Sequence, residues 1–246
     1  MTLVFLLALA LKDNSIADIA YGGAFIVATS AAVWRTGLVH PRQTLVLVMV
    51  AVWGARLASH IFIRNRGRGE DFRYRKWREE WGRWFVVRSY FQIYMLQGAI
   101  ALVIASPALA VMALPGRPLG WLDLLGLAVW ALGLTFESVG DYQLLRFKRD
   151  RANKGKIMTL GLWRYTRHPN YFGECTLWWG VFLVALGSPG TWWTVISPLT
   201  INYLLLSVSG IPMLEKKYEG NPDFEEYRRR TSPLIPWFPR KGRGGG

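Results

Sequence analysis

Long blocks of apolar residues, rather than an alternation of apolar and polar positions, dominate this chain. A helix that crosses the roughly 30 Å hydrocarbon core of a bilayer needs about 20 mostly apolar residues, since each residue adds about 1.5 Å. Blocks that reach or approach this length lie at 16–34, 43–63, 89–114, 118–136, 170–187 and 191–211. The pattern therefore predicts an all-α, polytopic membrane bundle of six or seven helices.

The first apolar stretch, Leu3–Leu11, is too short to span a bilayer by itself. It does not read as a signal peptide, because no small-residue cleavage site follows it and Lys12, Asp13 and Asn14 interrupt it. We interpret it as the remnant or the inner half of a first helix.

The domain organisation is simple. Pro115-Gly116 and the residues 187–190 mark tight turns between apolar blocks, and neither an internal repeat nor a flexible linker is visible. We expect one membrane-embedded domain over 1–239 and a basic, glycine-rich tail over 240–246. The single cysteine, Cys175, excludes an internal disulfide and a multi-cysteine metal site within one chain, and no metal is expected.

Positive charge is concentrated in three connections. The net charge is +14, and 25 of the 30 Lys and Arg residues lie at 64–88, 146–168 and 215–246. Alternating helices place these three segments on one side of the membrane, which the positive-inside rule assigns to the cytosol. Arg35 and Arg42 fall on the other side as a mild exception. A nucleic-acid-binding protein would not need six apolar blocks, so we interpret the charge as that of a multi-pass integral membrane protein.

The 64–88 connection is rich in aromatic residues as well as arginines. It is too polar to span the membrane, and its tyrosine and tryptophans are unusual for a plain linker. We expect it to fold back over the membrane face. The alternative is an interfacial belt of Trp and Arg that only anchors the neighbouring helices.

Several ionisable residues interrupt the apolar blocks, and each costs several kcal/mol at the bilayer centre unless it is paired or hydrated. They are Asp18, Arg56, Glu137, Asp141 and Glu174. Glu137 and Asp141 are four positions apart and therefore share one helix face. We expect these groups to line a polar cavity; the alternative is that buried ion pairs set the helix register.

The densest concentration of polar chemistry lies at 161–174. Pro169 suits the first turn of a helix, because it needs no backbone donor there. The side chains just before it are Arg164, Arg167 and His168. The N-terminus of a helix already favours an anion, and Asn170 and Glu174 follow one turn apart. This arrangement suits a phosphate-bearing molecule. A basic patch on anionic lipid headgroups would explain the arginines but not the Asn and Glu.

A second basic cluster, Arg64-Asn65-Arg66-Gly67-Arg68-Gly69-Glu70-Asp71, lies on the same expected face. Its glycines let the backbone approach a ligand closely, and its arginines can bind phosphate oxygens bidentately. It is not a Rossmann or P-loop pattern.

Four segments together resemble one family. Arg167-His168-Pro169-Asn170-Tyr171-Phe172-Gly173-Glu174 resembles the signature of the membrane steroid 5-alpha-reductase superfamily, which includes sterol reductases. Asn65-Arg66-Gly67-Arg68 resembles its basic turn, and Asp141-Tyr142 its Asp-Tyr pair. Phe224-Glu225-Glu226-Tyr227 through Leu234-Ile235-Pro236 resembles its C-terminal stretch. The resemblance covers most of the chain and is strongest from about 137 to 237.

The resemblance implies a seven-helix bundle that binds NADPH in a cavity open to the cytosol. Hydride would pass to an activated, enone-type carbon–carbon double bond in a steroid-like or other lipid-soluble substrate. Carried over by motif, the cofactor-site residues are Arg66, Arg68, Asp141, Asn170, Glu174 and Tyr218, with Lys148 where the family has an arginine. Their neighbours in the two clusters complete the expected set: Arg64, Asn65, Arg164, Tyr165, Arg167, His168 and Tyr171. The expected partners are the substrate and membrane lipid, with no obligate protein partner.

One departure from the family concerns the catalytic groups. Steroid-reducing members carry a Gln-Glu pair and a later Tyr, which are missing here; the later position falls near Val52-Trp53-Gly54. Asp18, with Tyr21 beside it, is the nearest substitute. A carboxylic acid kept neutral by burial could donate a hydrogen bond to a substrate carbonyl. The alternative is that Asp18 caps or braces its helix.

Two other functions fit parts of the sequence. Membrane isoprenylcysteine carboxyl methyltransferases also carry an Arg-His-Pro-x-Tyr-x-Gly segment and use S-adenosylmethionine, a cofactor that would not need so many arginines. A non-catalytic lipid-binding or scaffolding membrane protein is the second alternative. A transporter is disfavoured, because paired broken helices in two halves are not visible.

Overall fold

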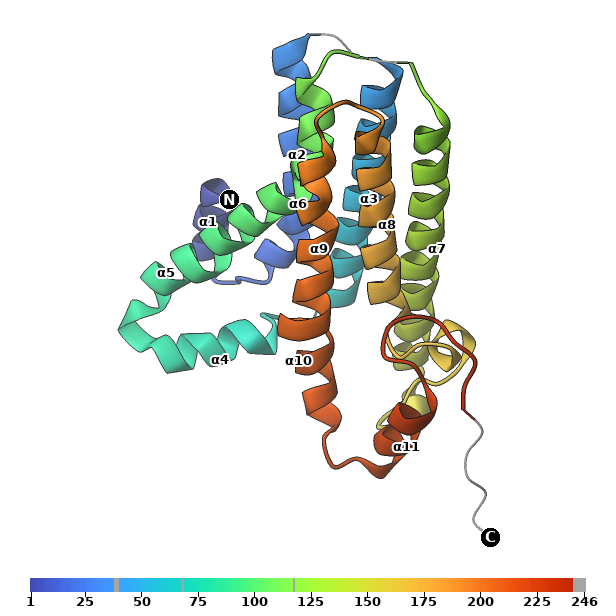
Figure 1. The fold of residues 1–246 in the computed structure, drawn as a ribbon. Helices are drawn as coiled ribbons and strands as arrows, with labels where there is room; N and C mark the ends of the chain where they lie inside the picture. The colour runs from blue at the N-terminus through green and yellow to red at the C-terminus, as the bar shows by residue number, and fades with distance from the viewer. Residues whose placement is uncertain (38–39, 68, 117, 241–246) are drawn as a thin grey trace. The chain divides into compact units, whose positions relative to one another are not determined.

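The structure is a computed structural model that describes residues 1–37, 40–67, 69–116 and 118–240 (Figure 1). The described residues form helices and connections without any strand; two backbone segments meet in one isolated bridge, between Thr166 and Ser232. The all-α fold class is therefore confirmed. Arg68 and most of the expected 240–246 tail lie outside the described residues.

The α-helices are α1 (Thr2–Leu11), α2 (Ile16–Thr36), α3 (Pro41–Asn65), α4 (Phe72–Trp81), α5 (Phe85–Arg88), α6 (Leu96–Ala113), α7 (Trp121–Arg149), α8 (Pro169–Leu186), α9 (Ile196–Tyr203), α10 (Ile211–Glu215) and α11 (Pro222–Arg230). Short 3-10 and π-helical segments join them: η1 (Gly82–Trp84), η2 (Ser89–Met95), η3 (Arg151–Asn153), η4 (Gly161–Arg164), η5 (Trp192–Val195), η6 (Leu204–Val208) and η7 (Lys216–Tyr218). As the proline predicted, α8 begins at Pro169, and the opening apolar stretch is the ten-residue α1.

Among the described residues, five helical runs are long and apolar enough to cross a membrane: Ile16–Arg35, Pro41–Asn65, Phe72–Ala113, Trp121–Arg149 and Trp192–Tyr218. In each of them fewer than half of the residues are buried, so apolar side chains such as Leu124 also cover the outside, as lipid requires. These helices support an integral membrane protein. The eighteen-residue α8 is not among the five; polar Asn170 and Glu174 occupy its first turns. The number of spans stays a prediction.

The chain divides into two compact units. The first comprises Met1–Asp123 and Val184–Ser197, and the second comprises Leu124–Leu183 and residues 198 onward. The expectation of one membrane-embedded domain over 1–239 stays a prediction.

In the first unit, two glycines allow α2 and α3 to pack backbone against backbone. A Cβ atom on Gly22 would lie 2.4 Å from the carbonyl oxygen of Gly54, so only glycine fits this crossing. Beside it, α1 packs against α2 and η2 (Figure 1). The Phe5 ring of α1 lies in edge contact with the Tyr94 ring. The short first helix is thus a packed element of the unit.

The 64–88 connection contains a helix instead of forming an open loop. Tyr74 of α4 is buried in the same apolar cluster as Phe5 and Tyr94, and Trp77 stacks on Trp81 with ring centroids 5.4 Å apart. These contacts hold Tyr74, Trp77 and Trp81 against the protein, whereas Phe72 and Trp84 are exposed. Whether this packed segment folds back over the membrane face, or anchors the neighbouring helices as an interfacial belt of Trp and Arg, stays a prediction.

In the second unit, α7 and α8 cross at glycines. A Cβ atom on Gly173 would lie 2.4 Å from the backbone nitrogen of Glu137, and one on Gly133 would lie 2.4 Å from that of Leu177. The C-terminal stretch is fastened to the segment before α8, since Trp237 N–H donates to the Tyr165 carbonyl at 2.9 Å. The two helices that carry the acidic and amide side chains are therefore held at close range.

Candidate functional site

The α7–α8 crossing brings Asp141 and Asn170 together. The Asn170 Nδ2 group donates a hydrogen bond to Asp141 Oδ1 at 3.1 Å, across 29 positions of sequence. Asp141 and Glu137 are buried one turn apart on α7, while Glu174 is half-buried one turn after Asn170 on α8. The sequence predicted both pairs, and the structure places the Asp141–Asn170 pair in direct contact.

Asn170 also presents an acceptor that the described residues do not use. Its Oδ1 atom is buried and has no hydrogen-bond partner among the described residues. An amide oxygen buried without a donor costs roughly 1–3 kcal/mol, and a ligand with an N–H or O–H group could supply the missing donor here. The crossing is therefore a candidate binding site for a molecule with N–H or O–H groups.

Arg167 and His168 do not face an open site. Arg167 Nε donates to Glu215 Oε1 at 2.8 Å, and its NH1 group donates to the carbonyls of Thr231 and Arg228 at 2.6 and 3.1 Å. His168 Nε2 lies 2.9 Å from the same Glu215 oxygen. These bonds tie the start of α8 to the C-terminal segment. The structure thus gives both residues an organising role, and cofactor contact by either stays a prediction.

The other cofactor-site candidates of this unit are Arg164, Tyr165, Lys148, Tyr171 and Tyr218. Arg164, Tyr165 and Lys148 are exposed, and Tyr171 stacks on the His168 ring with centroids 5.4 Å apart. Tyr218 stacks on Phe224 with centroids 5.0 Å apart. The Arg164 and Lys148 side chains reach the surface, whereas the stacked rings contribute to packing.

The basic turn of the first unit follows α3. The Arg66 N–H group donates to the Phe62 carbonyl at 2.9 Å as the helix ends, and Arg64 Nε donates to Asn65 Oδ1 at 3.1 Å. Gly67 and Gly69 have φ of +78° and +67°, the left-handed region that glycine adopts without strain. Arg68 lies outside the described residues. The meeting of this turn with Asn170 and Glu174 in one chamber stays a prediction.

Asp18 has strong partners that the sequence did not reveal. Arg73 NH2 donates to its Oδ2 atom, and the Tyr74 hydroxyl donates to its Oδ1 atom, both at 2.7 Å. Both carboxylate oxygens of Asp18 therefore accept hydrogen bonds within the protein, whereas the catalytic hypothesis needs one of them to donate to a substrate. Tyr21 packs edge-on against Phe25, 5.1 Å between centroids. The geometry favours the bracing alternative for Asp18, and catalysis by Asp18 and Tyr21 stays a prediction.

The two acids after the basic turn anchor it to the α1–α2 connection. Glu70 Oε1 accepts from the backbone and side chain of Asn14, and from Arg78. Asp71 N–H donates to the Ser15 hydroxyl at 2.7 Å. Burial alone would raise the pKa of both carboxyls, but hydrogen bonds from Arg78 and Asn14 to Glu70, and from Arg73 to Asp71, leave each pKa below its ordinary value.

A buried ion pair between Arg42 and Asp123 escaped the sequence reasoning. Both side chains are almost fully buried, and Arg42 Nε donates to Asp123 Oδ1 at 2.7 Å. An arginine in the first turn of a helix opposes the helix dipole, which is the signal that could have revealed a hidden partner. Since Asp123 balances its charge, Arg42 is a weak exception to the positive-inside pattern. Glu215 was also missed, because its partners lie 47 and 48 positions away.

The described residues contain no group of three or more His, Cys, Asp or Glu side chains that could hold a metal ion.

The first unit contains an apolar cavity of about 420 Å³ between α2 and α6, lined by Met1, Phe25, Ala28, Gly98 and Leu102 among others. The chain therefore offers both a polar crossing and an apolar cavity, in different units.

Comparison with known proteins places the chain in a family. The family model "Protein of unknown function (DUF1295)" matches residues 4–231, and the chain belongs to this family, within the steroid 5-alpha-reductase-like superfamily. The superfamily resemblance seen in the sequence is thereby confirmed.

Two curated relatives are similar to it. An uncharacterised protein of Schizosaccharomyces pombe is 26% identical over 222 residues, which is 79% of this chain and 63% of the relative. The 3-oxo-5-alpha-steroid 4-dehydrogenase 1 of Rattus norvegicus is 26% identical over 116 residues, 46% of this chain and 41% of the relative. The chain thus spans less than two thirds of either relative. No solved structure matches it.

Proposed function

We propose that this protein is an NADPH-dependent membrane reductase that saturates an activated, enone-type carbon–carbon double bond in a lipid-soluble substrate. The single observation that supports it most is the Asp141–Asn170 contact, with an unused buried amide oxygen, at the crossing of α7 and α8. The similarity to the rat 3-oxo-5-alpha-steroid 4-dehydrogenase 1 supports the same class of reaction.

The side chains at the crossing fit the nucleoside part of such a cofactor. The free Oδ1 of Asn170 accepts hydrogen bonds, and the carboxylates of Asp141 and Glu174 are acceptors as well. Acceptors bind amide N–H groups and ribose hydroxyls, which a dinucleotide provides, and they do not bind phosphates. Phosphate recognition falls to the cations: Lys148 and Arg164 in this unit, and Arg64, Arg66 and Arg68 of the basic turn.

When bound, NADPH supplies the hydride that reduces the substrate double bond. The contribution of this chain is to bind and orient it. The Asp141–Asn170 bond holds the amide in one rotamer, and the glycine contacts at 133 and 173 keep α7 and α8 at close range.

The substrate is the second part of the proposal. The apolar cavity of about 420 Å³ suits a hydrophobic molecule that reaches the protein through the bilayer. We propose membrane lipid and this substrate as its partners, with no obligate protein partner. The three basic segments place the cofactor site on the cytosolic side in this proposal.

The test is ligand binding by the full chain in detergent, followed by thermal unfolding. A ligand specific to the folded state at 100 times its Kd adds about 2.7 kcal/mol of stability. NADPH should raise the unfolding midpoint and quench tryptophan fluorescence, and S-adenosylmethionine should do neither. With a 3-oxo-4-ene steroid present, consumption of NADPH should be coupled to loss of the double bond.

Two variants make the test specific. Asn170→Leu should abolish the NADPH-induced shift, measured against the variant's own ligand-free midpoint, which falls because Asp141 loses a donor. Thr176→Val, which removes a half-buried hydroxyl from the same helix, is the matched control and should bind NADPH normally. Stabilisation by S-adenosylmethionine would instead identify a methyltransferase, and no response to either cofactor would favour a lipid-binding protein.

A further inference from the structure

A groove of about 650 Å³ lies between the last turns of α7 and the 150–161 connection that follows it. Its apolar lining consists of Val139, Tyr142, Phe147, Met158 and Leu160, with Gly161 beside them. Val139, Tyr142 and Arg146 line it at the i, i+3 and i+7 spacing of one helix face, which is opposite to the face of Asp141. The groove is therefore separate from the α7–α8 crossing, and none of its lining residues is a cofactor-site candidate.

The position of the groove along α7 corresponds to the headgroup level of a bilayer. Trp121 and Tyr142 are 72% and 60% exposed, and they lie about 32 Å apart along a helix that rises about 1.5 Å per residue. This separation matches the thickness of the hydrocarbon core, at whose two boundaries exposed Trp and Tyr side chains gather. The charged residues Arg146, Lys148 and Arg149 follow Tyr142. In a membrane-spanning α7, the groove thus begins in the apolar core and ends among headgroups.

Two polar side chains of the groove hold its walls together. Gln143 Oε1 accepts from Leu162 N–H at 3.0 Å, which fastens the end of the connection to α7. Asn153 Nδ2 donates to the Phe147 carbonyl at 3.1 Å, which fastens the beginning of the connection to the same helix. Because both side chains bond within the protein, they shape the groove and leave ligand binding to its charged residues.

Arg146 and Asp150 are the two charged residues that line the groove, and both are exposed. They are four positions apart, a spacing at which Lys76 and Glu80 form an ion pair at 3.6 Å. Within the described part of the chain, however, neither Arg146 nor Asp150 takes part in an ion pair. Asp150 Oδ1 accepts from Ala152 N–H at 2.9 Å, and its second oxygen has no such bond. The groove thus presents one cation and one anion beside an apolar lining.

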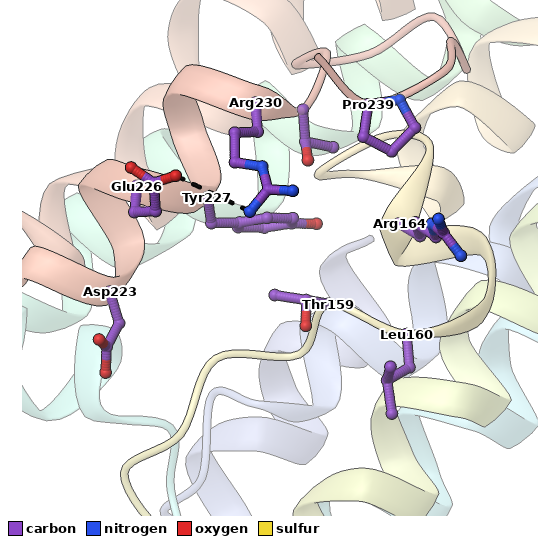
Figure 2. A pocket seen from close by; sticks show the side chains of 9 residues that line it. Thr159, Leu160, Arg164, Asp223, Glu226, Tyr227, Arg230 and Pro239 are labelled. Atoms are coloured by element: carbon purple, nitrogen blue, oxygen red, sulfur yellow. Dashed lines mark ion pairs between the residues drawn. The ribbon is translucent and has the colours of Figure 1, made fainter. Parts of the chain in front are cut away.

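A neighbouring pocket of the same unit, between η4 and α11, provides a contrast (Figure 2). It shares Leu160 with the groove, but its Arg230 already lies 3.8 Å from Glu226, as the dashed line in Figure 2 marks. Its Tyr227 hydroxyl donates to the Trp163 carbonyl. In that pocket an arginine and an acid pair with each other, whereas in the groove the corresponding charges are left for a molecule that carries both signs.

From this arrangement we propose that the groove binds one phospholipid whose headgroup carries a phosphate and a primary ammonium, as in phosphatidylethanolamine. The Arg146 guanidinium donates to the phosphate, and the Asp150 carboxylate accepts from the ammonium. An acyl chain lies along Val139 toward the hydrocarbon core. Phosphatidylcholine has no N–H group to donate to Asp150, and phosphatidylglycerol brings no positive charge to it. This lipid site goes beyond the proposed reaction and does not depend on it.

The experiment is native mass spectrometry of the full chain in detergent, titrated with dioleoyl phosphatidylethanolamine, phosphatidylcholine and phosphatidylglycerol. The first phosphatidylethanolamine should bind about tenfold more tightly than either other lipid. Arg146→Gln should weaken it about tenfold. Asp150→Asn keeps the oxygen that accepts from Ala152 and should make phosphatidylethanolamine and phosphatidylglycerol bind equally.

Arg149→Gln is the matched control, because it removes the same charge from the same end of α7 but lies outside the groove lining. It should retain the preference for phosphatidylethanolamine. All three substituted side chains are exposed, so the unfolding midpoints of the variants should equal that of the parent chain. A preference lost in Arg146→Gln and Asp150→Asn but kept in Arg149→Gln would support the site.

Two results would overturn the assignment. The first is tightest binding of phosphatidylglycerol that disappears at high salt and depends on Arg149 as much as on Arg146. That result would identify a diffuse basic surface on anionic headgroups, since salt screens exposed charges. The second is equal retention of the three lipids by every variant, or retention of none, which would show that the groove selects no headgroup.

Discussion

The Asp18 and Arg42 clusters of the first unit and the Asp141–Asn170 crossing of the second differ in how completely their groups are paired. In the first unit, Asp18 accepts from Arg73 and Tyr74, and Arg42 is bound by Asp123 and by the Gly187 carbonyl at 2.6 Å. In the second, the Asn170 amide donates to Asp141 while its oxygen has no partner among the described residues. A saturated cluster stabilises the fold, whereas an unsaturated one leaves bonding capacity for a ligand.

The largest expected effect tests the saturated side of this comparison. Asp123→Asn leaves the Arg42 charge buried without its counter-ion, which typically costs about 3–5 kcal/mol. The thermal unfolding midpoint in detergent should fall sharply. Glu79→Gln removes a charge from an exposed position and should have no measurable effect. Arg42→Met combined with Asp123→Leu should recover much of the loss; a midpoint for Asp123→Asn equal to the control would contradict the assignment.

The second-largest expected effect tests whether close packing of α7 against α8 forms the binding site. Gly173→Ala places a Cβ atom 2.4 Å from the backbone of Glu137, so α7 and α8 must separate, at a typical cost of about 1–3 kcal/mol. Separation should also break the Asp141–Asn170 bond and weaken NADPH binding. Gly23→Ala is the matched control, because its Cβ would meet nothing within 4 Å in α2. Normal NADPH binding by Gly173→Ala would show that close helix packing is not what forms the site.

A smaller effect decides the role of Asp18. Asp18→Asn removes the charge that binds Arg73 and should lower stability by about 1–2 kcal/mol, with turnover per folded molecule unchanged. Tyr74→Phe should reproduce part of the same stability loss. The opposite pattern, an unchanged unfolding midpoint with lost turnover, would restore the catalytic role and make Asp18 part of an active site.

The smallest effect concerns pH. Glu70 and Asp71 have pKa values below their ordinary 4.5 and 3.8, so the folded state binds fewer protons than the unfolded state in this range. Their contribution to stability is present above these ordinary values and is lost as the pH falls below about 4.5 through the lowered pKa values. Glu70→Gln should flatten this acid dependence of the unfolding midpoint. Glu80→Gln, at an exposed position, should retain it, and equal curves for the two variants would refute the linkage.

Patterns along the chain were sufficient to predict the helices and their class. Apolar blocks of spanning length predicted the membrane bundle, and Pro169 predicted the start of α8. The four-residue spacing of Glu137 and Asp141 predicted that both lie on one helix face. These are local properties, because hydropathy, helix periodicity and proline geometry act over a turn or a single segment.

Only the tertiary structure decided which polar groups pair. Glu215 binds Arg167 and His168, Arg73 and Tyr74 bind Asp18, and Asp123 binds Arg42. Each pairing joins residues 47 to 81 positions apart, so it depends on how helices pack and not on any periodicity. The sequence by itself determined where charged and amide groups enter the helices. Packing determined which are neutralised and which, like Asn170 and Arg164, retain bonding capacity for a ligand.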